Sequence, residues 1–183
     1  MNKRETIINK ALDITSEKGW HALTLLDVAK GCDMRFSELL EWFQDKTDLL
    51  VGYGRILDAQ TTEDMKGQID PDLPVKDILF DVLMTRIDLI SERRDAVVSI
   101  LRAMKCEPVS GLIVFPHLAH SMRYMLDISG CSIAGMRGHM AVLALGFAYL
   151  QALRVWVNDD SVDLSKTMAA LDKNLGYFEK AGF

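Results

Sequence analysis

The side chains of this sequence best suited to contact a polyanion lie between positions 24 and 46. Thr24 can bond a phosphate through its hydroxyl and through the free amides at the start of the helix that follows it. The residues after it supply further donors, acceptors and aromatic rings. The candidate binding residues of this segment are Thr24, Arg35, Phe36, Ser37, Glu38, Glu41, Trp42 and Lys46. The alternative interpretation is that Thr24 only caps its helix and Trp42 only packs.

The central part of the chain is suited to a second kind of binding, that of a small apolar ligand. The chain has 10 methionines, whose flexible and polarizable side chains suit a pocket that adapts to its ligand. Arg86 or His120 could hold one polar group of such a ligand. The candidate ligand-binding residues are Phe80, Leu83, Met84, Ile87, Met104, His120, Met122, Met125, Leu143 and Phe147. A solid core without a cavity is the alternative, because Met and aromatic stripes at helical spacing usually form cores.

Catalytic and metal-binding patterns are not found in the sequence. It contains no GxSxG, Walker, HExxH or GxGxxG motif, and Gly52-Tyr53-Gly54 lies in a helical pattern and not in a phosphate-binding loop. His117 and His120 are three residues apart, a spacing that two metal ligands can use. Since no cysteine or carboxylate clearly joins them, we expect no metal, no cofactor and no enzymatic activity.

The composition is that of an ordinary globular protein and excludes a strongly basic or disordered chain. Of 183 residues, 49% are apolar and 26% are charged, and the net charge is −5. The N-terminal 20 residues are charged throughout and have no apolar signal-peptide core. An odd number of cysteines without a CxxC pair predicts reduced thiols, at Cys32, Cys106 and Cys131. We therefore expect a cytoplasmic protein.

The segment Met140–Val157 is nearly long and apolar enough to span a membrane. It contains Gln151 and Arg154, and a charge within lipid is costly, so we expect a buried helix and no membrane span. Small residues recur here every three or four positions and allow close helix approach. We expect a homodimer interface formed by Gly138, Ala141, Leu145, Ala148, Ala152, Met168, Leu171 and Leu175.

Helical spacing of apolar residues accounts for nearly the whole chain, and no alternating strand pattern is found. We expect helices at about 3–18, 25–31, 35–43, from 45 onward, 75–92, 96–104, 114–128, 135–158 and 164–181. The helices within the first 45 residues are too short to be stable alone, so they must pack on one another. Two short helices joined by a tight turn form a helix-turn-helix. A polar linker with Pro71 and Pro74 marks a boundary near residue 70.

Residues 4 to 50 contain a series of features without a gap in the spacing: Gly19, Thr24, Val28-Ala29, Leu40-Glu41-Trp42-Phe43, Lys46 and Leu49-Leu50. In this series the segment resembles the DNA-binding domain of the TetR family of transcriptional regulators. The family pattern has a glycine after the first helix, a capping threonine, an Ile-Ala pair, an aromatic-rich helix end, a lysine and paired leucines.

The resemblance implies an all-α fold of about nine helices in two domains. Residues 1–47 would form a three-helix, homeodomain-like helix-turn-helix that contacts double-stranded DNA through the candidate binding residues between Thr24 and Lys46. Residues 48–183 would form a helical bundle for ligand binding and dimerisation. The implied function is that of a repressor that binds operator DNA as a dimer and responds to a small apolar ligand.

The sequence departs from the family pattern at the positions that touch DNA. Asp33-Met34-Arg35 replaces Gly-Val-Ser in the turn, Glu38 stands where a small hydroxyl residue is usual, and Leu40 replaces a phosphate-bonding tyrosine. Residues 1–46 contain seven basic and eight acidic side chains, a net charge of −1. Two alternatives therefore stay open. One is a TetR-fold lipid- or isoprenoid-binding protein that has lost DNA binding, and the other is a scaffold that binds a protein through Trp20 and Trp42.

Overall fold

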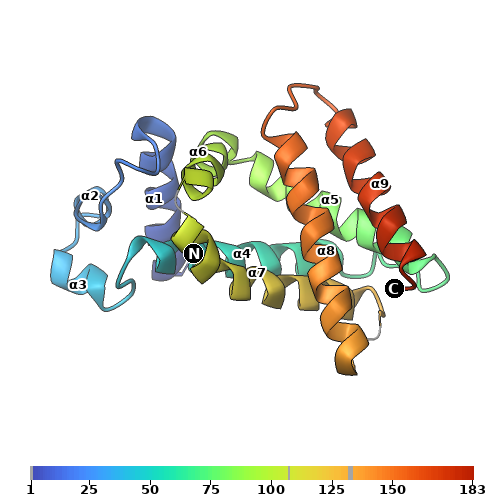
Figure 1. Ribbon diagram of the computed structural model, residues 1–183. Helices are drawn as coiled ribbons and strands as arrows, with labels where there is room; N and C mark the ends of the chain where they lie inside the picture. The colour runs from blue at the N-terminus through green and yellow to red at the C-terminus, as the bar shows by residue number, and fades with distance from the viewer. Residues whose placement is uncertain (1, 107, 132–133) are drawn as a thin grey trace. The chain divides into compact units, whose positions relative to one another are not determined.

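The computed structural model describes residues 2–106, 108–131 and 134–183, which form helices joined by turns, with no strand among them (Figure 1). The all-α prediction is confirmed. The helices of the described residues are α1 (Lys3–Lys18), α2 (Leu25–Gly31), α3 (Phe36–Leu40), α4 (Lys46–Asp64), α5 (Val75–Ser91), α6 (Arg94–Cys106), α7 (Pro108–Ile128), α8 (Gly135–Trp156) and α9 (Ser165–Lys180).

The chain divides into two compact units that do not follow the predicted domain boundary after residue 47. The first unit combines Met1–Leu57 with Ile90–His117, and the second combines Asp58–Leu89 with Leu118–Phe183. Helix α6 therefore belongs with the N-terminal helices. The proline linker near residue 70 lies inside the second unit and does not separate the two.

The first unit is built around one apolar face of α1. Ile7, Ile8, Ala11 and Leu12 are buried there at helical spacing. Helices α2, α3 and α6 and the start of α4 complete this core with Trp20, Leu23, Val28, Ala29, Leu39, Phe43, Leu49, Ala96 and Ile100. The Trp20 amide donates a hydrogen bond of 2.8 Å to Ser99 Oγ on α6. The helix-turn-helix thus depends on a helix that lies far along the sequence.

The second unit buries the apolar faces of α5, α8 and α9 together with the second half of α7. Its core includes Leu79, Val82, Leu83, Ile87, Met122, Met125, Leu126, Leu145, Trp156, Leu171 and Leu175. Helices α8 and α9 pack side by side and run in opposite directions (Figure 1).

Asp159 joins α8 to α9 through a buried carboxylate. It accepts hydrogen bonds from the amide and hydroxyl of Thr167, at 2.9 and 2.7 Å, and from the amide and hydroxyl of Ser161, at 3.2 and 2.5 Å. Burial raises the pKa of this carboxyl, but the hydrogen bonds from Ser161 and Thr167 outweigh that effect and hold the pKa well below its usual value. Asp159 therefore satisfies a free amide in the first turn of α9, and Asp163 accepts a bond of 3.2 Å from the Ser165 amide.

Helices α3 and α7 differ most from the lengths that the sequence predicted. Helix α3 is limited to Phe36–Leu40, whereas a helix over 35–43 was expected. Helix α7 begins at Pro108, whereas a helix over 114–128 was expected. Proline lacks an amide hydrogen and has a fixed φ, so the first position of a helix accepts it.

Helix α8 is long and apolar enough to cross a membrane, judged by length and composition, and among the described residues no other helix meets these criteria. Half of its apolar window is buried within the protein, and a core helix meets the same criteria.

Candidate nucleic-acid interface and ligand core

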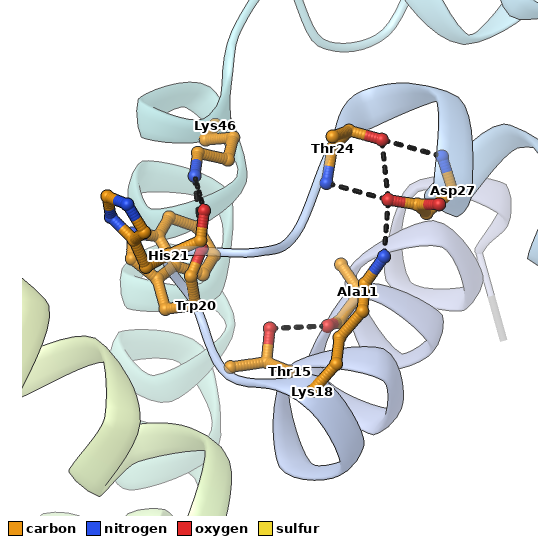
Figure 2. A network of polar contacts seen from close by, with 8 residues as sticks. All are labelled: Ala11, Thr15, Lys18, Trp20, His21, Thr24, Asp27 and Lys46. Atoms are coloured by element: carbon orange, nitrogen blue, oxygen red, sulfur yellow. Dashed lines mark hydrogen bonds and ion pairs between the residues drawn. The ribbon is translucent and has the colours of Figure 1, made fainter.

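Thr24 caps α2 through a reciprocal pair of hydrogen bonds with Asp27 (Figure 2). Its hydroxyl donates to Asp27 Oδ2 at 2.5 Å and accepts from the Asp27 amide at 3.2 Å. The Lys18 ammonium lies 2.5 Å from the same carboxylate. The hydrogen bonds from Lys18 and then Thr24 lower the pKa of Asp27 to about 2. In this arrangement the Thr24 hydroxyl is used within the chain as a helix cap.

Lys46 is likewise engaged within the first unit. Its ammonium donates to the Trp20 carbonyl at 3.0 Å and lies 5.3 Å from the centre of the Trp20 ring (Figure 2). These contacts fasten the first residue of α4 to the segment that follows α1. The charge of Lys46 is therefore directed at backbone carbonyls and an aromatic face.

The turn between α2 and α3 contains a residue with left-handed backbone geometry. Asp33 has φ 56°, which aspartate tolerates better than most residues other than glycine. It occupies the position at which the family pattern has glycine. The Met34 amide then donates to the Ala29 carbonyl at 3.0 Å and closes the turn.

Helix α3 is held by two buried side chains and turns its other residues outward. Leu39 and Phe43 are fully buried, one helical turn apart. The outward residues are Arg35, Phe36, Ser37, Leu40 and Glu41, all exposed. Of the remaining DNA-contact candidates, Trp42 is half-buried. Within the described part of the chain, the predicted DNA-contact residues that are exposed next to one another are therefore those on this side of α3.

Glu38 is paired with a cation from another helix. The Lys3 ammonium of α1 forms an ion pair with it, and the hydrogen bond and charge of Lys3 lower the pKa of the Glu38 carboxyl. Both side chains remain partly exposed, so solvent screens the pair. The pairing nevertheless offsets one of the two negative charges that the sequence places near α3.

The structure brings together six of the ten predicted ligand-binding residues. Leu83, Ile87, Met122 and Met125 are buried, and Phe80 and Met84 are half-buried, all in the second unit. The other four lie elsewhere. Met104 packs against the core of the first unit, and His120, Leu143 and Phe147 are exposed. The reason is that periodicity alone does not reveal which side of an apolar helix faces inward.

The predicted dimer interface requires a similar correction. Gly138, Ala141, Leu145, Ala148 and Ala152 are buried within the subunit, as are Leu171 and Leu175, so they belong to its core. Met168 is 39% exposed. The exposed apolar side of α8 consists instead of Met136, Met140, Leu143, Phe147 and Leu150. We call this set the α8 stripe; its alternating spacing of four and three residues is typical of a helix–helix contact surface.

A buried polar network lies among the apolar side chains of the second unit. Arg86 Nη1 of α5 donates to Asp58 Oδ1 of α4 at 2.6 Å, and Ser121 Oγ of α7 donates to Asp58 Oδ2 at 2.8 Å. The Arg86 guanidinium lies 5.9 Å from the centre of the Tyr149 ring. Burial raises the pKa of Tyr149, and the charge of Arg86 offsets part of that rise.

Sequence reasoning identified Arg86 in this network but missed Asp58 and Ser121. Asp58 lies directly after the buried Leu57 and three residues before the buried Thr61, and this pattern could have revealed it. Within the described ranges, no group of three or more His, Cys, Asp or Glu side chains is arranged to hold a metal ion.

Sequence comparison finds neither a matching family model nor a matching curated protein. Solved structures, in contrast, match over almost the full chain. A TetR transcriptional regulator from Nitrosomonas europaea is 15% identical, with 98% of this chain and 99% of that chain covered and a TM-score of 0.78. A TetR regulator from Rhodococcus sp. RHA1 is 16% identical, with 96% and 94% covered and a TM-score of 0.70.

A third structure is Thermus thermophilus FadR, a TetR-family transcriptional repressor in complex with lauroyl-CoA. It is 17% identical, with 99% of this chain and 95% of that chain covered and a TM-score of 0.69. At these identities the comparison establishes the fold and not the activity. The chain therefore has the fold of the TetR transcriptional regulators.

Proposed function

We propose that this protein is a cytoplasmic transcriptional repressor that binds operator DNA as a dimer and responds to a small apolar ligand. The observation that carries the proposal is the outward side of α3. Leu39 and Phe43 fix the helix from within, while Arg35, Ser37 and Glu41 are exposed where a helix-turn-helix presents base contacts.

The chemistry of these side chains suits readout in the major groove. Arg35 can donate two hydrogen bonds to guanine, Glu41 can accept from the amino group of cytosine, and Phe36 can contact a thymine methyl group. Few phosphate contacts are available, since Thr24 and Lys46 are engaged within the chain. We therefore expect a shallow dependence of affinity on salt concentration.

A second copy of the chain would cover the α8 stripe. Phe147 is 61% and Met140 is 52% exposed, and an apolar row of this length is unusual on a monomer surface. Pairing of two stripes would set the separation of the two α3 helices on DNA. A ligand that binds one of two dimer states more tightly would then change operator affinity.

The test is fluorescence anisotropy with a duplex from the promoter region of the protein's own gene, at low and at physiological salt. We expect saturable binding with a shallow salt dependence, and we expect the affinity to fall at least tenfold when Arg35 is replaced by alanine. Lys30→Ala, which removes an exposed cation from α2, is the matched control and should have a smaller effect. Absence of saturable duplex binding at low salt would remove the regulator assignment.

The internal engagement of Thr24 and Lys46 favours a second candidate, a TetR-fold carrier of a lipid or isoprenoid without DNA function. Leu40 at the phosphate-bonding tyrosine position supports the same alternative. Glu38→Lys/Glu41→Lys discriminates between the two: if duplex binding is found only in that variant, the native α3 is a scaffold. Native mass spectrometry of the gently purified protein should then detect a retained acyl or isoprenoid molecule.

A further inference from the structure

A polar cluster in the second unit has hydrogen-bonding capacity that the surrounding protein does not use. We define the Arg86 cluster as Asp58, Thr61, Arg86 and Ser121. Arg86 is 3% exposed and Thr61 is fully buried, yet Arg86 Nε and Thr61 Oγ1 have no hydrogen-bond partner among the described residues. Buried polar atoms are nearly always paired, so two such atoms in one cluster require an explanation.

Thr61 is unusual among the helical threonines of this chain. The hydroxyls of Thr15, Thr62 and Thr85 each donate to the carbonyl four residues earlier, at 2.7 to 2.9 Å. That bond is the ordinary way for a helical threonine to satisfy its hydroxyl. Thr61, which lies almost one turn after Asp58 on α4, does not make it. Its hydroxyl is therefore available to a group from outside the chain.

The charges in the cluster restrict what that group can be. The Asp58 carboxylate neutralises Arg86 and uses both of its oxygens, one with Arg86 and one with Ser121. A second carboxylate at this place would meet the charge of Asp58 in a poorly solvated region, which is unfavourable. An uncharged oxygen acceptor can take the remaining Arg86 Nε hydrogen without that repulsion.

The side chains near the Arg86 cluster are apolar, which indicates that the rest of the ligand is apolar as well. Leu83 and Ile87 flank Arg86 in sequence on α5, and Met122 and Met125 follow Ser121 on α7, all buried. Methionine side chains adapt their shape to a guest molecule. We propose that the Arg86 cluster binds the uncharged carbonyl oxygen of an apolar ligand, such as a ketone or an ester, through Arg86 Nε and Thr61 Oγ1. This inference rests on the proposed ligand-binding role of the second unit.

Thermal unfolding of the full chain at pH 7.5, without DNA, tests the proposal with 2-decanone, decanoate and decane as probes. We expect 2-decanone to raise Tm more than either decanoate or decane, because a bound ligand stabilises the folded state. Thr61→Val keeps the side-chain shape and removes the hydroxyl. It should weaken 2-decanone binding roughly tenfold, the loss of one buried hydrogen bond, while the ligand-free protein keeps or gains stability.

Thr62→Val is the matched control, because the Thr62 hydroxyl is satisfied by the Asp58 carbonyl at 2.8 Å and lies outside the cluster. It should leave 2-decanone binding unchanged. Failure of 2-decanone to exceed decane, equal stabilisation by decanoate, or wild-type affinity in Thr61→Val would each overturn the proposal. The ligand assay contains no DNA, so it is independent of operator binding. If the protein binds 2-decanone but no operator DNA, the proposed site at the Arg86 cluster stands and only the proposed role as a regulator fails.

Discussion

The helix-turn-helix of the first unit and the Arg86 cluster of the second unit use their polar side chains in opposite ways. In the first, exposed groups that could bind a phosphate are already paired: Thr24 with Asp27, and Lys46 with the Trp20 carbonyl. In the second, the buried atoms Arg86 Nε and Thr61 Oγ1 have no hydrogen-bond partner among the described residues. Exposure is therefore a poor guide to binding capacity in this chain, and the pairing of each polar atom is a better one.

The two units also contain ion pairs that should differ greatly in energetic effect. Arg86→Met is expected to lower the free energy of unfolding by about 3 kcal/mol, because Asp58 would keep its charge without a counterion. The exposed pair of Lys3 and Glu38 should contribute far less to the free energy of unfolding, because solvent screens it. Urea unfolding followed by circular dichroism compares Arg86→Met with Lys3→Met directly.

The double variant Asp58→Leu/Arg86→Met is the control for this comparison. Replacement of both partners by apolar residues of similar size should recover most of the stability that Arg86→Met loses. If Arg86→Met were no less stable than Lys3→Met, the contrast between the two units would be wrong.

The helix caps of the two units provide the next comparison. Asp159→Asn should lower the free energy of unfolding by about 2 kcal/mol at pH 7, since the charged acceptor of four hydrogen bonds is lost. The pKa of Asp159 is held below its usual value, so its contribution is complete above pH 5 and declines as the pH falls below about 4. The stability gap between wild type and variant should therefore narrow in acid. A gap that stays constant from pH 7 to pH 3 would contradict the assignment.

The exposed cap of α2 should have a smaller effect. Thr24→Ala is expected to lower the free energy of unfolding by about 1 kcal/mol. Thr24→Asp keeps a capping oxygen but adds a negative charge at a position that the sequence predicts to contact DNA. If Thr24→Asp preserves stability and abolishes duplex binding, Thr24 lies at the DNA surface. If Thr24→Asp preserves both stability and duplex binding, Thr24 acts only as a helix cap.

The smallest expected effect concerns backbone geometry. Among the described non-glycine residues, only Asp33 in the first unit and Leu164 in the second have positive φ, at 56° and 53°. Asp33→Gly should change the free energy of unfolding by no more than about 0.5 kcal/mol, because aspartate already tolerates this conformation. Asp33→Val should lower it by about 1 to 2 kcal/mol, since a β-branched residue does not. Thermal unfolding of the two variants checks the difference.

Local features of the structure could be predicted from the sequence, and long-range ones could not. The bounds of α1 and α2 match the prediction because apolar spacing and caps such as Thr24 are encoded within a few residues. The sides of α8 were assigned wrongly because this helix is apolar nearly all round, with one row buried in the subunit and the α8 stripe exposed. A single sequence does not distinguish two such rows.

The candidate binding sites show the same difference between local and long-range features. The accessible residues near α3 were predicted because a gap-free motif specifies them. The Arg86 cluster was predicted only in part, because Asp58, Arg86 and Ser121 come from three helices and meet only through tertiary packing.

The composition of the first unit has a consequence for how the protein is made. Its core needs Ala96, Ile100 and Ser99 of α6, which are synthesised well after the helix-turn-helix. A nascent chain that ends at residue 57 would leave α1 and Trp20 without these neighbours on the ribosome. We therefore expect that the helix-turn-helix does not fold as an independent module after truncation at residue 47, and that a fragment of that length exposes apolar surface to chaperones and proteases.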